Sequence, residues 1–529
     1  MTFWAKSIRI FKCLYDHGTQ SVRQVARKTG LSKSSVHRLT QAMQRRDSHP
    51  ESWWWETAEG RQWLTRLVLA TLYTFGLKRG VGLDTISEFF VRLHLATQVG
   101  CSASALRGVM HTLEAALLET AVAWEHEGQT SGEVREIIGA VDETFLERMI
   151  LVCMDLPTGY LLLEAVAEDR TYPMWKALVE ERLTALGAHV LYVVSDRAKA
   201  LVQLAETGLE CLSMPDFFHV IHAIVKSYSL AIGQRRRHAQ QELTKAQEAL
   251  ARRQGRRPAD QDTAEAQALV AARQAAVTRW DEAHHSYRGH LEHLSLTLHP
   301  FRLADSPPQT SAQVESQLTA TVEAIEALAQ CHQLPARQDA MAKVRTQVPA
   351  LAALIDFWWD GVHQDLEPFR LSPRWQQWVH ECLLPMVYWA HQVSRTRCCR
   401  RKAKIQEALE AVRAAFEQHP ITRRLAPHVL AEWQAWATDR VKAFQRASSA
   451  VEGRNGVLSQ LHHNQRGLPK QRYKVWTVLH NFDCHAADGT TPASRFFRRT
   501  FPDVFETVLS QIEVLPRARQ RKEQGALCH

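Results

Sequence analysis

The stretch EIIGAVDETFLERMILVCMDLPTGYLLLEAVAEDR, residues 136–170, contains three short runs that are rich in apolar and β-branched residues. The first run, 136–145, is short and apolar up to an acid, Asp142, at which we expect it to end. The second and third runs are separated by the turn-forming residues Asp155, Pro157, Thr158 and Gly159. This pattern predicts three strands in meander order.

The alternation of elements continues beyond these strands. Residues 172–186 have the pattern of a helix, and HVLYVVSDRA, 189–198, is typical of a buried strand that delivers Asp196 at its end. Another helix and a strand within ECLSMPDFFHV, 210–220, come next. The order β-β-β-α-β-α-β, with acids on the first and fourth strands, is that of a ribonuclease-H-like fold. In that topology these two strands are neighbours, so we expect Asp142 and Asp196 to meet at one edge of the sheet.

Five motifs in this order carry a family resemblance: GAVDETF (139–145), LYVVSDRAKA (191–200), PDFFHVIHAI (215–224), SSAVEGRNGVLSQLHHNQRG (448–467) and HNFDCHAADGTTPASRFF (480–497). Through them the chain resembles DDE transposases of the bacterial insertion-sequence kind over about 136–500. The resemblance implies that Asp142, Asp196 and Glu452 are the three metal-binding and catalytic carboxylates. It also implies cleavage and transfer of DNA strands with two Mg²⁺ ions, for which Mn²⁺ can substitute.

The chemistry accounts for such a trio. Two Mg²⁺ ions about 3.5–4 Å apart can activate a water or a 3′-hydroxyl and stabilise the charge of an in-line displacement at phosphorus. Hard cations prefer carboxylate oxygens to thiols or imidazoles, and without metal the three acids would repel one another and raise their pKa values. Glu143 follows Asp142 directly and is expected to point to the opposite face of its strand, so it is not a predicted ligand.

Several other residues near the predicted site have candidate roles. Asp216 and His219 form an Asp-x-x-His motif that the resembling families often carry, and the alternative role for Asp216 is to cap a helix. Asn455 lies one turn after Glu452 and is expected to hold its carboxylate or to touch DNA. Two arginines of the same stretch are expected to contact backbone phosphates: Arg454 and Arg466.

The N-terminal segment has a helix-turn-helix pattern. In SVRQVARKTGLSKSSVHRLTQAMQRR, 21–46, apolar residues recur at helical spacing, Gly30 supplies the turn and Ser32 is placed to cap the second helix. The residues predicted to face DNA are Lys33, Ser34, Ser35, His37 and Arg38. Residues 1–50 contain ten Lys or Arg and two Asp, a charge of about +8 out of the net +9 of the chain. A plain helical hairpin with a solvated basic face is the alternative.

The 529 residues are too many for one core, so we expect a multidomain protein, mainly α, with an α/β ribonuclease-H-like core (a mixed five-stranded sheet) interrupted by a large all-α insertion. Residues 82–119 allow either a second helix-turn-helix or plain helical packing. The predicted domains are a DNA-binding helix-turn-helix (1–50), a helical domain that is either a second DNA-binding domain or a linker (51–133), the first part of the core (134–233), the insertion with an antiparallel coiled coil (234–440), the C-terminal core helices (441–512) and a basic disordered tail (513–529).

Composition and apolar patterning indicate the cellular location of the protein and the class of its binding partner. The net charge of +9 and the pI near 9.1 favour a polyanionic partner. No signal-peptide pattern and no uncharged apolar run of about 20 residues are present, so we expect a cytoplasmic, nucleoid-associated protein without a membrane partner. The ten cysteines contain no CxxC pair, which argues against a zinc ribbon or a disulfide framework.

The function expected from the sequence is that of a transposase. Its partners would be double-stranded DNA, both the terminal repeats of the element and target DNA, and synapsis would require a homodimer or a higher assembly. The alternatives are a DNA-binding protein derived from a transposase, without strand transfer, and a coiled-coil scaffold whose basic faces are merely solvated.

Overall fold

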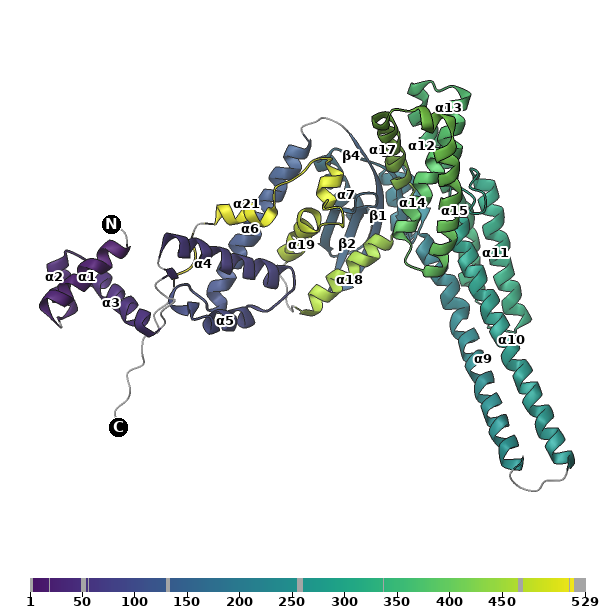
Figure 1. The fold of residues 1–529 in the computed structure, drawn as a ribbon, viewed down its shortest axis with the longest axis horizontal. Coiled ribbons are helices and arrows are strands. Elements are labelled where there is room, and N and C mark those ends of the chain that lie inside the picture. Colours follow the sequence, from purple (N-terminus) through teal and green to yellow (C-terminus); the bar gives the residue numbers. More distant parts are fainter. Residues whose placement is uncertain are drawn as a thin grey trace.

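The computed structural model describes residues 3–18, 20–48, 54–55, 57–129, 134–254, 260–335, 337–464, 470–512 and 514–517. The molecule is elongated, with three N-terminal helices at one end, a mixed sheet near the middle and a large helical region with a long hairpin at the other end (Figure 1). A mainly helical chain with a mixed five-stranded sheet confirms the predicted fold class. Within the described residues, no helix is long and apolar enough to span a membrane.

The N-terminal domain consists of α1 (Phe3–His17), α2 (Val22–Thr29) and α3 (Lys33–Ser48). The predicted turn is confirmed, because Gly30 ends α2 in the left-handed conformation with φ 69°. The backbone N–H of Ser35 donates to the Ser32 hydroxyl at 3.2 Å, which confirms Ser32 as the cap of α3. The three helices enclose a small core of their own, formed by Ile10, Cys13, Val25, Ala26, Val36 and Leu39.

A second helical region follows, with α4 (Ala58–Thr71), a π-helical turn (Leu72–Leu77), α5 (Leu83–Arg92), a 3₁₀ turn (Leu95–Thr97) and α6 (Ala103–Gln129). The helix α6 packs against α5 and against C-terminal helices, and its buried Glu114 forms an ion pair with Arg472. Its buried apolar residues belong to the same hydrophobic cluster as the sheet. This arrangement favours helical packing over a second helix-turn-helix for residues 82–119.

The sheet contains β1 (Arg135–Leu146), β2 (Arg148–Asp155), β3 (Tyr160–Ala167), β4 (Ala188–Ser195) and β5 (Leu212–Pro215), in the order β3-β2-β1-β4-β5. The first three strands form the predicted meander, and β4 pairs with β1 in parallel. The expectation that the first strand ends at Asp142 is wrong. β1 continues to Leu146 because residues 142–146 still pair with β2, and a tight turn at Glu147, with φ 57°, closes this hairpin.

Two helices of the core lie between the strands in sequence. The helix α7 (Tyr172–Leu186) has the predicted bounds and ends at Gly187, whose φ of 57° is left-handed. It connects β3 to β4, and α8 (Lys199–Gln203) with a π-helical turn (Leu204–Gly208) connects β4 to β5.

A long helical hairpin leaves the sheet directly after β5. It consists of α9 (Phe217–Gln254) and α10 (Asp260–Thr297), which pack against each other along their lengths (Figure 1). The predicted domain boundary at 233/234 falls inside α9, which runs without a break from the edge of the sheet into the hairpin.

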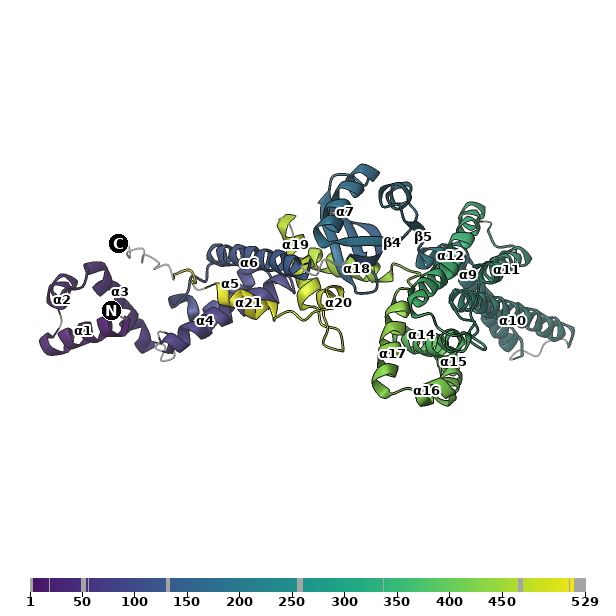
Figure 2. The same ribbon diagram turned by 90° about the horizontal axis from the view of Figure 1, so that it is seen from above.

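The rest of the insertion is a helical bundle beside the hairpin, and α12 packs on the edge strand β5 (Figure 2). Its core is rich in aromatic residues, among them the fully buried Trp378, Tyr388 and Trp389. The bundle contains α11 (Ser311–Cys331), α12 (Gln338–Leu366), a 3₁₀ turn (Glu367–Phe369), α13 (Pro373–Trp378), a π-helical turn (Val379–Leu383), α14 (Leu384–Arg395), α15 (Cys399–Gln418), α16 (Pro420–Arg424) and α17 (Pro427–Lys442).

The chain then returns to the sheet through α18 (Ser449–Asn464), α19 (Lys470–Asp483), α20 (Pro492–Phe496) and α21 (Val504–Gln511). The helix α18 packs on β1 and β2, and α19 packs on β3 and α6. The side-chain amide of Asn481 on α19 bonds to both the N–H and the C=O of Leu161 at 2.9 Å, which fixes α19 to β3. The C-terminal helices thereby complete the core that the insertion interrupts.

Candidate active site

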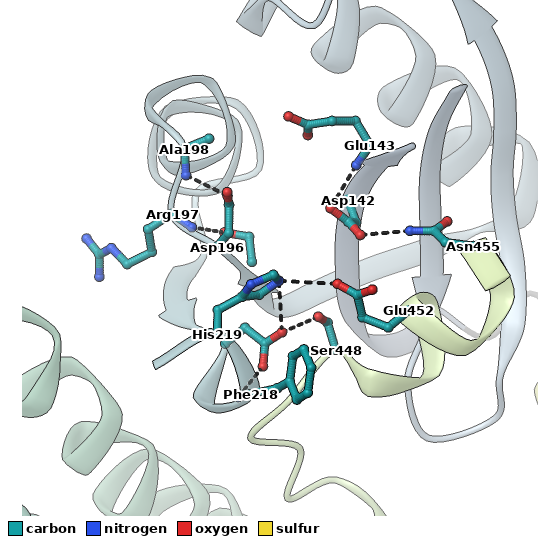
Figure 3. Close-up of polar contacts among 12 residues, drawn as sticks. Asp142, Glu143, Asp196, Arg197, Ala198, Phe218, His219, Ser448, Glu452 and Asn455 are labelled. Carbon is teal, nitrogen blue, oxygen red and sulfur yellow. Dashed lines mark hydrogen bonds and ion pairs between the residues drawn. The ribbon is translucent and has the colours of Figure 1, made fainter. Parts of the chain in front are cut away.

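The strand register brings the first two acids to the same level of the sheet. Ala140 on β1 pairs with Val194 on β4, and Asp142 and Asp196 each follow two residues later. Because the strands are parallel neighbours, both acids come from adjacent strands at one edge, as expected from the topology (Figure 3).

Asp142 is half-buried and held by two hydrogen bonds. Its Oδ1 accepts from the backbone N–H of Glu143 at 2.9 Å, and its Oδ2 accepts from Nδ2 of Asn455 at 2.8 Å. Burial, and after it the negative charge of Glu452, raise the pKa of Asp142 to about 7 against the lowering effect of the Glu143 hydrogen bond. Glu452 is therefore close enough to Asp142 for the two negative charges to oppose each other.

Asp196 lies directly after β4 and turns the chain toward α8. Its Oδ1 accepts from the backbone N–H of Ala198 at 2.8 Å, and the following residue, Arg197, has a left-handed φ of 60°. Asp196 is partly exposed, so it remains accessible at the end of the strand.

Glu452 occupies the first turn of α18, where the helix dipole favours a negative charge. Its Oε1 lies 3.4 Å from Nε2 of His219, on the first turn of α9, and the same nitrogen lies 3.6 Å from Oδ2 of Asp216 (Figure 3). The final acid therefore comes from a segment more than 250 residues after Asp196, yet faces the same part of the sheet as Asp142.

The structure confirms Asp216 as the cap of α9, and its auxiliary role in the active site stays a prediction. Its Oδ1 accepts from the backbone N–H of Phe218 at 2.8 Å, which caps α9, while its Oδ2 accepts from the hydroxyl of Ser448 and faces His219. The fully buried carboxylate thus joins the start of α9 to the residue that precedes α18.

The donor set at this site fits a hard divalent cation in part. Asp142 and Glu452 are two carboxylates that oppose each other's charge, and a cation between them would relieve the raised pKa of Asp142. In the part of the chain that the structure describes, however, no three His, Cys, Asp or Glu side chains lie close enough together to hold a metal ion. Asp196 would have to approach the other two carboxylates to complete such a site.

Two expectations for the residues around Glu452 need correction. Arg454 is buried, and its Nε and Nη2 donate to both carboxylate oxygens of Glu164 on β3 at 2.5 and 2.7 Å, so it joins α18 to the sheet instead of facing DNA phosphates. Asn455 holds the carboxylate of Asp142 and not that of Glu452. Arg466 lies outside the described residues.

Two acids near the site that are not predicted ligands, Glu143 and Asp155, have other partners. Glu143 forms an ion pair with Arg170 on the other side of β1, as its position in the strand predicts. Asp155 is buried at the end of β2, where it accepts hydrogen bonds from Ile138 and Thr158 within the turn.

The predicted DNA-reading residues lie on one helix, α3. Lys33, Ser34, His37 and Arg38 are exposed, whereas Ser35 is partly buried, and its hydroxyl accepts a hydrogen bond from Ser32 at 2.8 Å. Four of the five residues are therefore accessible to a ligand along α3.

Two residues that position the site, Ser448 and Tyr192, could not be identified from the sequence. Ser448 bonds to Asp216 across 232 positions, and its place just before a helix could have marked it as a cap but not as a partner of Asp216. The hydroxyl of Tyr192 on β4 donates to the carbonyl of Ala443 at 2.9 Å and accepts from the N–H of Gln445 at 2.9 Å. These bonds fix the segment before α18 to the strand that carries Asp196.

Comparison with known families gives two partial matches. Residues 5–47 match the IclR helix-turn-helix domain, and residues 379–524 match a family of unknown function, DUF6399. No curated protein matches the chain. The helix-turn-helix domain indicates DNA binding, and its combination with a mixed sheet and helices fits a DNA-binding, transposase-like layout.

Proposed function

We propose that the protein is a DDE transposase that cleaves DNA at the ends of an insertion sequence and transfers the resulting strands to target DNA. The single observation that carries the proposal is the meeting of Asp142 and Glu452, 310 positions apart, beside the strand end that bears Asp196. The helix-turn-helix domain supplies the DNA-binding function that such an enzyme needs.

The reaction consists of two displacements at phosphorus. In the first, water adds to a phosphodiester and the 3′-oxygen of the neighbouring nucleotide leaves, which gives a 3′-hydroxyl and a 5′-phosphate. In the second, that 3′-hydroxyl attacks a phosphodiester of the target and displaces its 3′-oxygen. Mg²⁺ or Mn²⁺, bound by Asp142, Asp196 and Glu452, would activate the attacking oxygen and stabilise the charge at phosphorus.

The surrounding residues have positioning roles in this proposal. Asn455 holds one oxygen of Asp142, and His219 lies against Glu452. The Ser448 to Asp216 bond and the Tyr192 bonds keep the start of α18 beside the sheet. These contacts hold the carboxylates of Asp142 and Glu452 in place although their negative charges repel each other.

The test is an incubation of the purified protein with Mg²⁺ and a DNA fragment that contains the terminal repeats of the element. We expect strand cleavage by the native protein and none by Asp142→Asn. The matched control is Glu143→Gln, which changes the adjacent acid on the opposite face of β1 and should leave cleavage intact. Equal cleavage by native protein and Asp142→Asn would exclude the proposal.

The second candidate is a DNA-binding protein derived from a transposase. It is favoured by the separation of the acids, since no three candidate ligands among the described residues are close enough for one metal ion. DNA binding without cleavage by the native protein, in either Mg²⁺ or Mn²⁺, would support it.

A further inference from the structure

Four cationic side chains gather where the helical insertion returns to the sheet, and we call this set the basic junction: Arg395, Arg401, Lys442 and Arg446. Arg395 is the last residue of α14, Arg401 lies in the first turn of α15, and Lys442 is the last residue of α17. The helix α14 packs against both α15 and α17, and its residue His391 lies within the electrostatic reach of both Arg395 and Lys442. Arg446 follows four residues after Lys442, in the segment that leads to α18.

The charges of the basic junction act on one another. The pKa of Arg446 is lowered by burial and, against the opposing effect of Tyr388, by the positive charges of Arg401 and Arg395. Burial, and after it the positive charges of Arg395 and Lys442, lower the pKa of His391 to about 4. The cationic groups are therefore close enough to repel one another.

Carboxylates do not neutralise this set. Among the described residues, none of the four forms an ion pair with an acid, and Arg446 instead donates to the carbonyls of Ser295 and Leu298 at 3.0 and 2.6 Å. The nearby Glu292 is already shared by Arg400 and Lys404, at 3.0 and 2.8 Å.

The helix dipole explains only part of this arrangement. Arg395 and Lys442 stand at the C-terminal ends of helices, where a positive charge is favourable. Arg401 stands at the N-terminal end of the 20-residue α15, where the dipole opposes it. An anion at this position would interact favourably with the helix terminus and with the side chains together.

The basic junction is partly exposed, and the backbone of one member, Arg446, lies next to the start of α9 at the candidate active site. Arg395 is exposed, and Arg401, Lys442 and Arg446 are partly exposed. The carbonyl of Arg446 accepts from the N–H of Phe217, the residue after Asp216, at 3.0 Å. Two residues further, Ser448 bonds to Asp216 itself.

We propose that the basic junction binds backbone phosphates of DNA and guides one strand from the insertion to the carboxylates at the sheet edge. The identity of the anion as DNA rests on the proposed function, whereas the need for an anion rests on the uncompensated charges. Arginine suits this role because its planar guanidinium can donate two hydrogen bonds to one phosphate. The site lies within residues 379–524, the part of the chain that matches the family of unknown function.

The experiment measures DNA affinity by fluorescence anisotropy at several salt concentrations, in an Asp142→Asn background that separates binding from cleavage. The double variant Arg395→Ala, Arg401→Ala should make the negative slope of log K against log salt shallower by roughly 2, about one for each lost phosphate contact, and equally for different DNA sequences. Arg446 is left in place because it bonds to the carbonyls at the end of α10.

The matched control is Lys245→Ala, Arg345→Ala, which removes two cations of the insertion that already have acidic partners, Glu242 and Glu326. It should leave the slope unchanged. Thermal unfolding supplies a second readout, since removing two repelling charges should not lower the melting temperature, whereas loss of a structural contact would.

An unchanged slope in the junction variant, or an equal decrease in the control, would overturn the proposal. A companion titration with inorganic tripolyphosphate separates DNA from a small polyanion. Loss of tripolyphosphate binding in the junction variant with an unchanged DNA slope would contradict the assignment to DNA. A shallower slope in the junction variant, together with no cleavage by the native protein, would support this inference and contradict the proposed enzymatic function.

Discussion

At the scale of single residues, the ionisation of Asp142 sets the state of the candidate site. A carboxyl group whose pKa is about 7 is largely protonated at slightly acidic pH, and in that state it does not repel Glu452. At pH 8 Asp142 is mostly ionised, which favours uptake of a cation. The site is therefore expected to bind divalent ions more tightly as the pH rises through 7.

The first prediction concerns stability without metal. Because the folded pKa of Asp142 lies above its unfolded value, its contribution to stability is fully present below about pH 4 and is lost as the pH rises through 7. In EDTA at pH 8, Asp142→Asn should be more stable than the native protein by about 1–2 kcal/mol, after allowance for solvent screening. The two proteins should differ less at pH 5.

Denaturant unfolding at both pH values checks this prediction. Addition of Mg²⁺ at pH 8 should then stabilise the native protein and leave Asp142→Asn unaffected. Parallel stability curves for the two proteins between pH 5 and 8 would contradict the account of Asp142.

The second prediction concerns the buried ion pair between Arg454 and Glu164. Substitution Arg454→Met leaves the Glu164 carboxylate buried with Thr477 as its remaining hydrogen-bond donor, so we expect a loss of about 3–5 kcal/mol in unfolding free energy. The exposed pair of Glu88 and Arg92 is the control, and Arg92→Ala should cost about 0.5 kcal/mol or less. Similar losses in both variants would show that burial does not set the cost.

At the scale of elements, the turn of the helix-turn-helix depends on Gly30. Its left-handed φ of 69° disfavours any side chain, so Gly30→Val should destabilise the N-terminal domain by about 1–2 kcal/mol and weaken DNA binding. The control is Gly233, which lies inside α9 and has open space where a Cβ would be added. Gly233→Ala should stabilise the protein slightly, by up to about 1 kcal/mol. Circular dichroism during heating measures both changes.

The attachment of the segment before α18 to β4 gives the fourth prediction. Tyr192→Phe removes the hydroxyl that bonds to Ala443 and Gln445, leaving buried backbone groups unpaired at a cost of about 1–3 kcal/mol. Because this segment positions Ser448 and Glu452, strand cleavage should fall by more than DNA affinity. Tyr172→Phe, on α7 away from this segment, is the control and should change neither.

At the scale of the whole molecule, the proposed function requires DNA reading and strand chemistry to occupy separate parts of the chain. The N-terminal domain has its own small core, apart from the cluster that joins the sheet and the other helices. Arg38→Ala should therefore weaken DNA binding, whereas Asp142→Asn should abolish cleavage and leave binding intact. The binding deficit should be the same in the double variant as in Arg38→Ala alone. Gel-shift titrations of the three variants check this, and loss of binding in Asp142→Asn would contradict the separation.

Much of the fold could be predicted because local patterns determine it. Apolar runs and turn residues predicted the meander and the bounds of α7, and the strand order then brought Asp142 and Asp196 to one edge. The partners of long-range contacts could not be predicted in this way. The sequence predicted Arg454 as an exposed cation, because it does not reveal that Glu164, 290 positions away, is its buried partner. A charge pattern along one helix does not reveal which acid another element buries beneath it.

The unbroken course of α9 has a mechanical consequence. Its first turn carries His219 against Glu452, and at 1.5 Å per residue its 38 residues form a rod of about 57 Å. The helix packs against α10 and α12, so we expect a displacement of the hairpin to be transmitted along it to the edge of the sheet. A partner that binds the distant tip of the hairpin should therefore displace the His219 imidazole relative to the Glu452 carboxylate. Assembly far from the strand ends could in this way change the geometry of the candidate site.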